Sequence, residues 1–184
     1  VQRKLNAKLS ISEGVFKTVS RGGRFILKPQ SPDYLELPQN EDLTMKLAAS
    51  MGINTPLHGL MYCSDRSFTY FIKRFDRKGK SEKLAVEDFA QLAGASRETK
   101  YDFSMERIIS LIERFCTFPQ IEKQKFFLLT LFSFLAGNED LHLKNLSLIR
   151  RDDLAEFSPA YDLVNSCLAI KTSEELALPL RGKK

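Results

Sequence analysis

The chain has 184 residues, of which 43% are hydrophobic and 28% are charged, and its formal net charge is +5 at pH 7. This length allows one domain or two small lobes that share a core, and the hydrophobic content excludes an intrinsically disordered chain. No apolar run follows the basic first residues, so we expect no signal peptide.

The positive charge is concentrated before Gln30, where the only acidic residue is Glu13. Basic residues in such a concentration can surround the phosphates of a nucleotide, and a solvated basic surface is an equal alternative. The charge also permits contact with nucleic acid, but no evident helix of the kind that reads DNA accompanies it.

The three cysteines, Cys63, Cys116 and Cys167, are far apart, and each lies in an apolar stretch. An odd number of isolated cysteines favours free, buried thiols in a reducing cytoplasm. The paired Cys and His spacing that a zinc site requires is missing.

The first 30 residues alternate between apolar and polar positions, with turn signals at Glu13-Gly14 and at Arg21-Gly22-Gly23. This pattern predicts three antiparallel strands, the last of which ends at Lys28.

After a turn-rich connection, a helix is expected from about residue 39 to residue 51, with Gly52 as its stop. Its first turn should hold Asn40, Glu41 and Asp42, which suits the positive end of the helix dipole. The residues expected to share one apolar face are Leu43, Leu47, Ala48 and Met51.

Two further strands, 58–62 and 68–72, should pair around the turn at 64–67. Strands, one helix and two more strands match the small lobe of a kinase. The charged segment 74–80 is then a natural hinge, and Ile72 to Phe75 can offer a nucleotide base both backbone hydrogen bonds and an apolar wall. A charged connecting loop is compatible with that interpretation.

The remainder of the chain has a helical pattern. Apolar residues form one stripe at Met105, Ile108, Ile109, Ile112 and Cys116. Residues 126–136 are apolar nearly all round, so we expect this second helix to be buried, and it is too short to span a bilayer.

The segment from Gly137 to Asn145 carries the most informative pattern, because Asp140 precedes Asn145 by five residues on a loop. Protein kinases use this spacing in their catalytic loop, where the Asp accepts the proton of the attacking hydroxyl and the Asn holds magnesium. Taken alone, the pattern is weak, and a polar loop at a helix end is the alternative.

Two further features occur in the order that a kinase requires. Lys28 ends a strand, like the lysine that contacts the nucleotide phosphates, and Asp162 follows the loop where kinases carry a magnesium-binding aspartate. Each has a plain alternative: a surface lysine at a strand end and an aspartate in a turn. The three features in order are stronger evidence than any one of them.

With these features in this order, the chain resembles the HipA family of bacterial toxin kinases, and within it the shorter HipT-type toxins. The text that carries the resemblance is Val1-Gln2-Arg3-Lys4, Phe25-Ile26-Leu27-Lys28-Pro29, Asn40-Glu41, Arg74-Phe75-Asp76-Arg77, Glu87-Asp88-Phe89, Gly137-Asn138-Glu139-Asp140-Leu141-His142-Leu143-Lys144-Asn145 and Tyr161-Asp162. The family's Ser-x-x-Gly phosphate loop before the first motif is absent, as is the helical region that follows. We therefore expect the ordered part, or a fragment, of a longer toxin.

The resemblance implies an α+β, protein-kinase-like fold of two lobes, with a β-rich small lobe and a truncated helical large lobe. The expected division is a nucleotide-binding lobe over 1–73, a hinge over 74–80 and the first part of the catalytic lobe over 81–184.

The roles that follow are predictions from the motif and the resemblance together. Asp140 is the expected catalytic base, and Lys144 could neutralise the transferring phosphoryl group or be a solvated lysine. Asn145 and Asp162 are the expected magnesium ligands. The residues assigned to ATP binding are Lys28, Glu41, Lys73, Phe75 and His142.

Two of these assignments have alternatives. Glu41 could pair with Lys28 or act only as a charge at the start of the helix. His142 comes two residues after Asp140, and a hydrogen bond to the loop backbone suits it better than proton transfer, since Asp140 already provides a base.

By resemblance, the protein is an ATP- and Mg²⁺-dependent serine/threonine kinase, the cytoplasmic toxin of a type II toxin–antitoxin system similar to HipBA or HipBST. It would phosphorylate itself and an aminoacyl-tRNA synthetase. Its expected partners are a helix-turn-helix antitoxin, through which it would meet DNA indirectly, and a small HipS-like protein; no membrane contact is expected.

The residues themselves are also compatible with two other classes of function. Small-molecule phosphotransferases share the Asp-x-x-x-x-Asn spacing, so the motif alone does not exclude them. A catalytically silent nucleotide-binding or scaffolding module is the second alternative, which the absent phosphate loop favours and the intact Lys28, Asp140, Asn145 and Asp162 set disfavours.

Overall fold

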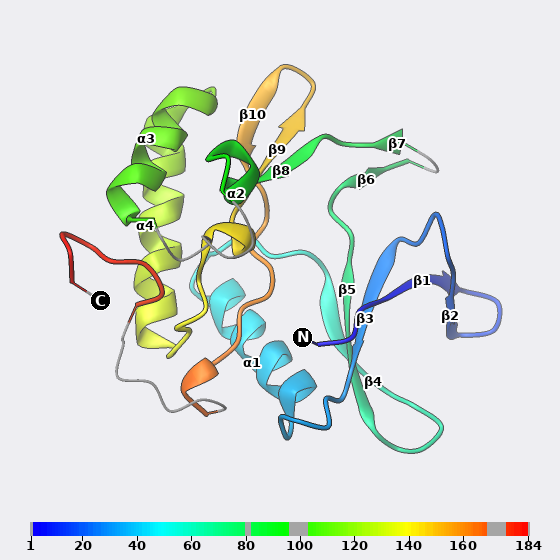
Figure 1. Ribbon diagram of the computed structural model, residues 1–184. Coiled ribbons are helices and arrows are strands. Elements are labelled where there is room, and N and C mark those ends of the chain that lie inside the picture. The colour runs from blue at the N-terminus through cyan, green and yellow to red at the C-terminus, as the bar shows by residue number, and fades with distance from the viewer. Residues whose placement is uncertain (1, 80–81, 96–102, 169–175, 184) are drawn as a thin grey trace.

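The computed structural model describes residues 2–79, 82–95, 103–168 and 176–183. The first part of the chain forms a five-stranded antiparallel sheet with the order β2-β1-β3-β5-β4, and helix α1 packs against β4 and β5 (Figure 1). These elements are β1 (Leu5–Ser10), β2 (Val15–Thr18), β3 (Phe25–Pro29), α1 (Leu37–Ser50), β4 (His58–Tyr62) and β5 (Phe68–Lys73).

The later part of the chain contains helices α3 and α4, packed side by side, and a three-stranded antiparallel sheet with the order β10-β9-β8 (Figure 1). The elements are β6 (Arg77–Lys78), β7 (Glu82–Lys83), β8 (Val86–Asp88), α2 (Phe89–Leu92), α3 (Met105–Phe115), α4 (Pro119–Leu135), β9 (Ser147–Arg151) and β10 (Leu154–Phe157). Two 3₁₀ helices, η1 (Leu143–Asn145) and η2 (Ser166–Leu168), complete the set.

The predicted hairpin at the start of the chain is confirmed. Strands β1 and β2 pair with Ser10 opposite Val15, and Gly14 takes a φ of 66° in the turn between them. A positive φ suits glycine, which has no Cβ to clash, so the Glu13-Gly14 signal correctly marked this turn. The predicted pairing of 58–62 with 68–72 is confirmed as well, since β4 and β5 form an antiparallel ladder.

The segment expected as a hinge is partly a strand. Residues Arg77–Lys78 form β6, which pairs with β7 through Arg77 opposite Lys83 and Lys78 opposite Glu82. Lys80, the last residue of the expected hinge, lies outside the described residues.

Helix α1 differs from the prediction in its start and in its buried face. It begins at Leu37, with Pro38 in the first turn, where a missing N–H costs nothing. Leu43, Leu47 and Met51 are exposed, at 59%, 49% and 45%. The expected apolar face was therefore wrong for these three residues.

The face that α1 buries carries Glu41, Met45 and Ala48, which recur at helical spacing. Glu41 and Asp42 lie beyond the first turn, so the expected placement at the positive end of the helix dipole was wrong. Asp42 instead contacts Lys46 at 2.6 Å and lies 3.3 Å from Nδ1 of His58. Both carboxylates are buried, and Glu41 is the one that pairs with the buried Lys28 of β3.

Helix α3 confirms its predicted stripe, with Met105, Ile108 and Ile112 buried. Helix α4 does not confirm burial all round, because Phe127, Phe134 and Leu135 are 67%, 46% and 65% exposed. The buried residues of α4 are Glu122, Phe126, Leu129, Phe132 and Ser133, and the helix packs against α3 and β10. None of the described helices is long and apolar enough to cross a bilayer.

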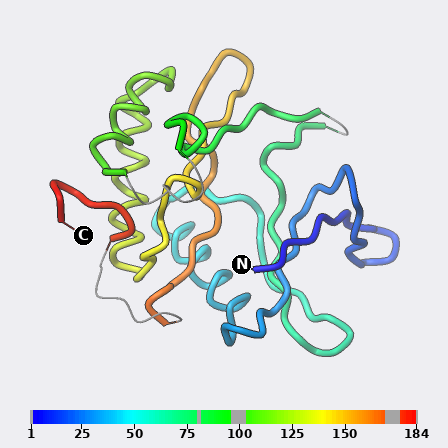
Figure 2. Tube along the Cα trace, in the orientation of Figure 1, coloured from blue at the N-terminus to red at the C-terminus, as the bar shows by residue number. Residues whose placement is uncertain are grey.

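One hydrophobic core joins both parts of the chain, with Met45 and Tyr70 from the first part and Phe89, Ile112 and Leu163 from the second. Residues 176–183 return to the start of α3, where Met105 N–H donates to the carbonyl of Pro179 at 3.1 Å (Figure 2). The segments that follow β5 therefore pack on the same core as α1, which fixes the position of the motif-bearing loops.

The three cysteines are free thiols, as predicted, but only Cys116 is buried. Cys63 is half-buried and Cys167 is exposed, so the expected burial was wrong for these two. Burial raises the pKa of Cys116 to about 12, so this thiol is protonated and shielded at neutral pH. We expect Cys167 to react first with a thiol reagent and Cys116 only after denaturation. Counting labelled cysteines by mass spectrometry before and after denaturation tests this order, and rapid native labelling of Cys116 would contradict the packing of α3.

Candidate active site

Lys28 is the centre of the candidate site. It lies on β3, is 2% exposed, and donates hydrogen bonds to Glu41 of α1 and to Asp162. Burial by itself would lower the pKa of the Lys28 ammonium, but the two carboxylates outweigh that effect and raise this pKa above its usual value. Lys28 is therefore a buried cation held between two acids, rather than the surface lysine that the strand alone permitted.

Glu41 is completely buried and uses Oε1 to contact Lys28. Burial raises the pKa of Glu41 to about 7, against the opposing effect of Lys28. Of the two interpretations of this residue, pairing with Lys28 is the one that the geometry supports.

Asp162 is held by two ammonium groups. Its Oδ1 accepts from Lys28, and its Oδ2 accepts from Lys4 Nζ at 2.7 Å. Burial opposes ionisation, but Lys28 and Lys4 outweigh it and hold the pKa of Asp162 well below its usual range. The residue also has a φ of 56°, a left-handed conformation that is uncommon outside glycine. A charged carboxylate in a strained backbone is typical of a functional position.

A cleft of about 230 Å³ opens beside Lys28 and Asp162. Its apolar wall consists of Ile26, Ile72, Phe75, Val86 and Tyr161. The polar residues that line the same cleft are Lys4, Lys28, Lys73, Arg74, Asp76, Ser147 and Asp162. An apolar slot next to a cluster of ammonium groups suits a flat base that is joined to phosphates.

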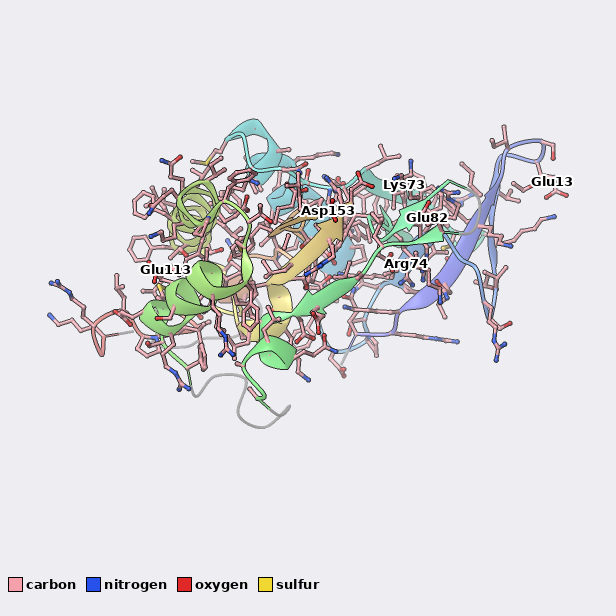
Figure 3. All side chains as sticks on the ribbon, turned by 90° about the horizontal axis from the view of Figure 1, so that it is seen from above. Glu13, Lys73, Arg74, Glu82, Glu113 and Asp153 are labelled. Atoms are coloured by element: carbon pink, nitrogen blue, oxygen red, sulfur yellow. The ribbon has the colours of Figure 1, made fainter. Side chains whose placement is uncertain are left out.

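Lys73 and Phe75, which the sequence assigned to ATP binding, both line this cleft. The Phe75 ring lies 5.6 Å from the Tyr161 ring, so the segment after β5 contacts the segment around Asp162. In Figure 3, Lys73 and Arg74 lie between Glu13 at one end and Glu113 toward the other, on the side nearer Glu13.

The Asp140 loop is a compact turn stabilised by its own backbone. His142 N–H donates to the Asp140 carbonyl at 2.9 Å and lies 3.4 Å from Oδ1 of Asn145, whose N–H donates to the His142 carbonyl at 2.9 Å. The Asp140 carboxylate lies 3.6 Å from Nε2 of His142, and its side chain is 47% exposed. Asp140 is thus accessible on a fixed turn.

Tyr161 connects this loop to Asp162. Its hydroxyl donates to the carbonyl of Lys144 at 3.0 Å, and the Ser147 hydroxyl, 2.5 Å away, is left to donate to the tyrosine oxygen. Burial raises the pKa of Tyr161, so this hydroxyl keeps its proton. The loop and Asp162 are therefore fixed relative to each other through one tyrosine.

The structure brings some of the predicted site residues together and leaves others apart. Lys28, Glu41 and Asp162 are in direct contact, and Lys73 and Phe75 share their cleft. The loop residues Asp140, His142, Lys144 and Asn145 are not among those that line the cleft, and they adjoin it through Tyr161.

Sequence reasoning missed Lys4 and Tyr161 as members of the site. Both residues belong to sequence motifs that carried the family resemblance, Val1-Gln2-Arg3-Lys4 and Tyr161-Asp162. Neither residue has a chemistry that spacing alone could assign, and only their contacts with Asp162 and with the Lys144 carbonyl reveal their positions.

The residues present fit a magnesium ion of the kind that phosphoryl transfer uses. Asp162 supplies an ionised carboxylate and Asn145 an amide oxygen, both hard donors of the type that Mg²⁺ prefers. The described residues hold no cluster of three or more His, Cys, Asp or Glu that could bind a metal by itself. Mg²⁺ commonly binds through one or two protein oxygens together with phosphates and water, so two donors of this kind are compatible with it.

Gly137, which opens the Asp140 loop, offers a test of how tightly that loop is packed. It has a φ of 64°, and a Cβ added there would come within 2.9 Å of Cys167 Sγ and 3.1 Å of Asn165 Oδ1. Gly14 is a matched control, because its φ is 66° but a Cβ would meet nothing within 4 Å. We expect Gly14→Ala to lower the free energy of unfolding by about 1 kcal/mol through backbone strain.

Gly137→Ala carries that same strain and an added clash, so we expect a loss of about 2–3 kcal/mol. Urea unfolding of both variants measures the difference between them. Equal losses for the two variants would mean that the segment around Asn165 and Cys167 does not press on the loop.

Comparison with known proteins identifies the relatives of this chain. The model of the family described as HipA-like C-terminal domain matches residues 1–184. A Haemophilus influenzae protein named "Putative kinase" is 30% identical over 194 residues, which cover 96% of this chain and 56% of that protein. The Shewanella oneidensis serine/threonine-protein kinase toxin HipA is 29% identical over 200 residues, which cover 98% of this chain and 45% of that protein.

Solved structures give the same result. HipA in a Shewanella oneidensis complex of HipA, HipB and operator DNA superposes with a TM-score of 0.85 at 28% identity, covering 100% of this chain and 47% of that one. The Helicobacter pylori proinflammatory kinase CtkA, at 17% identity, shares the fold with a TM-score of 0.64, covering 80% of this chain and 52% of that one. The expected kinase-like α+β fold is confirmed, and the chain spans about half the length of the relatives that it matches. The chain belongs to the HipA-like C-terminal domain family, which also confirms the resemblance to HipA drawn from its motifs.

Proposed function

We propose that the protein containing this chain is an ATP-dependent serine/threonine kinase. The observation that carries the proposal is the buried Lys28 ammonium, held by Glu41 and Asp162 at the wall of an apolar cleft. A cation fixed beside an ionised carboxylate is what a triphosphate and its metal need, because phosphoryl transfer depends on positioning and on neutralising charge.

Each group has a task in this proposal. Lys28 and Lys4 contact phosphate oxygens, and Glu41 holds Lys28 in place. The apolar wall around Ile72 and Phe75 takes the base, which would bond to the backbone near Lys73 and Phe75.

The metal would be held by Asn145 and Asp162 and, when bound, neutralises charge on the phosphates. Asp140 orients the hydroxyl of the acceptor and takes its proton, while Lys144 lies on the same loop with a charge that can face the transferring group. His142 holds the loop through its backbone N–H, as the contacts with Asp140 and Asn145 suggest. The division into a nucleotide-binding lobe over 1–73, a hinge over 74–80 and a catalytic lobe from 81 belongs to this proposal.

The biological context is also proposed from the family. We propose a cytoplasmic toxin of a HipBA- or HipBST-like type II system that phosphorylates an aminoacyl-tRNA synthetase and itself. A helix-turn-helix antitoxin would bind it and connect it to DNA, and a small HipS-like protein would be a further partner. The HipA–HipB–operator DNA complex of the Shewanella relative supports the antitoxin part of this proposal.

The test uses the full-length protein with radiolabelled ATP, with and without a panel of aminoacyl-tRNA synthetases. We expect Mg²⁺-dependent label on the protein itself and on one synthetase, with phosphoserine or phosphothreonine at the modified site. ATP turnover that labels only a small molecule would favour the phosphotransferase alternative. ATP binding without any transfer would favour the silent module.

A further inference from the structure

The segment that follows Asp162 lies between helix α1 and the Asp140 loop. On the α1 side, Asn40 bonds to both backbone groups of Asn165: its Oδ1 accepts the Asn165 N–H at 2.8 Å, and its Nδ2 donates to the Asn165 carbonyl at 2.9 Å. The Thr44 hydroxyl donates to the same Asn40 Oδ1 at 3.3 Å. This third contact fixes the orientation of the amide.

On the other side, Ser166 bonds to the start of the Asp140 loop. Its N–H donates to the Gly137 carbonyl at 2.9 Å. Its hydroxyl accepts the Glu139 N–H at 2.8 Å and donates to the Gly137 carbonyl at 3.3 Å. Ser166 is buried, so these bonds are protected from exchange with water.

Asn40 and Glu139 each adjoin a residue of the candidate site. Asn40 precedes Glu41, the partner of Lys28, and Glu139 precedes Asp140. A continuous path of hydrogen bonds therefore leads from the helix that positions Lys28, through Asn165 and Ser166, to the loop that carries Asp140.

We propose that Asn40 is a positioning residue that couples the Lys28–Glu41 pair to the Asp140 loop. The expected effect on catalysis rests on the proposed function, whereas the expected effect on the Asp140 loop does not. Asn40 holds the backbone of Asn165 in place through two hydrogen bonds. The position of Asn165 in turn places the Ser166 hydroxyl where it accepts the hydrogen bond from the Glu139 N–H. A shift of about 1 Å in the resulting position of Asp140 is enough to reduce phosphoryl transfer by about 100-fold.

The first experiment measures amide hydrogen exchange in the full-length Asn40→Ala variant. We expect faster exchange in the peptide that covers residues 137–142, although the hydrogen bonds removed by the substitution are those to the backbone of Asn165. Gln39→Ala is the matched control, because Gln39 lies on the same turn of α1 and its buried Oε1 has no hydrogen-bond partner among the described residues. The control should leave exchange at 137–142 unchanged.

The second experiment compares steady-state kinetics of Asn40→Ala, Ser166→Ala and the double variant. Each single change should lower kcat by about 10- to 100-fold while KM for ATP changes by less than about 3-fold, because Lys28 keeps both of its acids. The double variant should lose little more than either single one, since both residues act through one path. Ser166→Ala removes only a hydroxyl and keeps the test available if Asn40→Ala folds poorly.

The outcomes separate this inference from the proposed function. Altered exchange at 137–142 in a protein that transfers no phosphate would uphold the coupling and reject the kinase. An active wild-type kinase whose Asn40→Ala variant keeps both its kcat and the exchange of the loop would overturn the coupling. Fully additive losses in the double variant would also overturn it, because they would assign Asn40 and Ser166 to separate paths.

Discussion

Replacing Asp162 with Asn should abolish phosphoryl transfer by the full-length protein, with a loss of about 100-fold or more in kcat. The amide is almost isosteric but carries no charge, so it is a poor ligand for Mg²⁺. It also withdraws an anion from Lys28 and Lys4, both of which contact Asp162 directly. Because the metal ligand is weakened, part of the loss should appear as weaker binding of ATP·Mg²⁺.

Asp153→Asn is the control for this variant, because Asp153 is exposed on the turn between β9 and β10 and lines no part of the cleft. Initial rates measured across a Mg²⁺ titration separate a metal defect from a folding defect. Raised Mg²⁺ should partly restore Asp162→Asn if the metal assignment is correct. A variant that phosphorylates at the wild-type rate would remove Asp162 from the metal site.

The parts of the fold that follow from local chemistry were predictable. The β1–β2 turn at Gly14 and the pairing of β4 with β5 depend on nearby residues, so the printed sequence contains the relevant information. The α3 stripe was equally readable, because a helix with one apolar face has one obvious way to pack.

The buried face of helix α1 could not be predicted from hydrophobic periodicity. Its leucines at 43 and 47 suggested the core face, yet the helix buries Glu41 instead. The deciding interaction is the pair with Lys28, thirteen positions earlier on a different element. Hydrophobic periodicity does not include the cost of leaving a buried ammonium without a counter-charge, and that cost is larger than the gain from burying one leucine.

Some residues of the candidate site could likewise be predicted from the sequence, and others could not. Lys28 and Asp162 were identified by their order along the chain, and the structure joins them. Lys4 and Tyr161 could not be assigned from the sequence, because their roles depend on contacts across 158 positions in one case and with a backbone carbonyl in the other. Backbone acceptors leave no trace in an amino-acid sequence.

Replacing Asp140 with Asn should leave the fold and ATP binding intact while it removes phosphoryl transfer. The Asp140 side chain is 47% exposed and lies outside the cleft that we assign to the nucleotide, so we expect folding and ATP affinity to survive the loss of its charge. The turn is stabilised by the backbone bonds of His142 and Asn145, which the substitution leaves in place. An amide cannot accept the proton of a hydroxyl, and loss of a general base commonly costs about 100- to 10,000-fold in rate.

Three measurements on Asp140→Asn decide between a kinase and a scaffold. Thermal unfolding and titration with an ATP analogue should match the wild type, since a change confined to kcat is what removal of a base predicts. Growth arrest on expression should disappear, together with self-phosphorylation and labelling of the synthetase. Asp153→Asn should keep all of these activities. If the folded, ATP-binding Asp140→Asn protein still arrested growth, toxicity would not depend on phosphoryl transfer, and a binding function would replace the kinase that we propose.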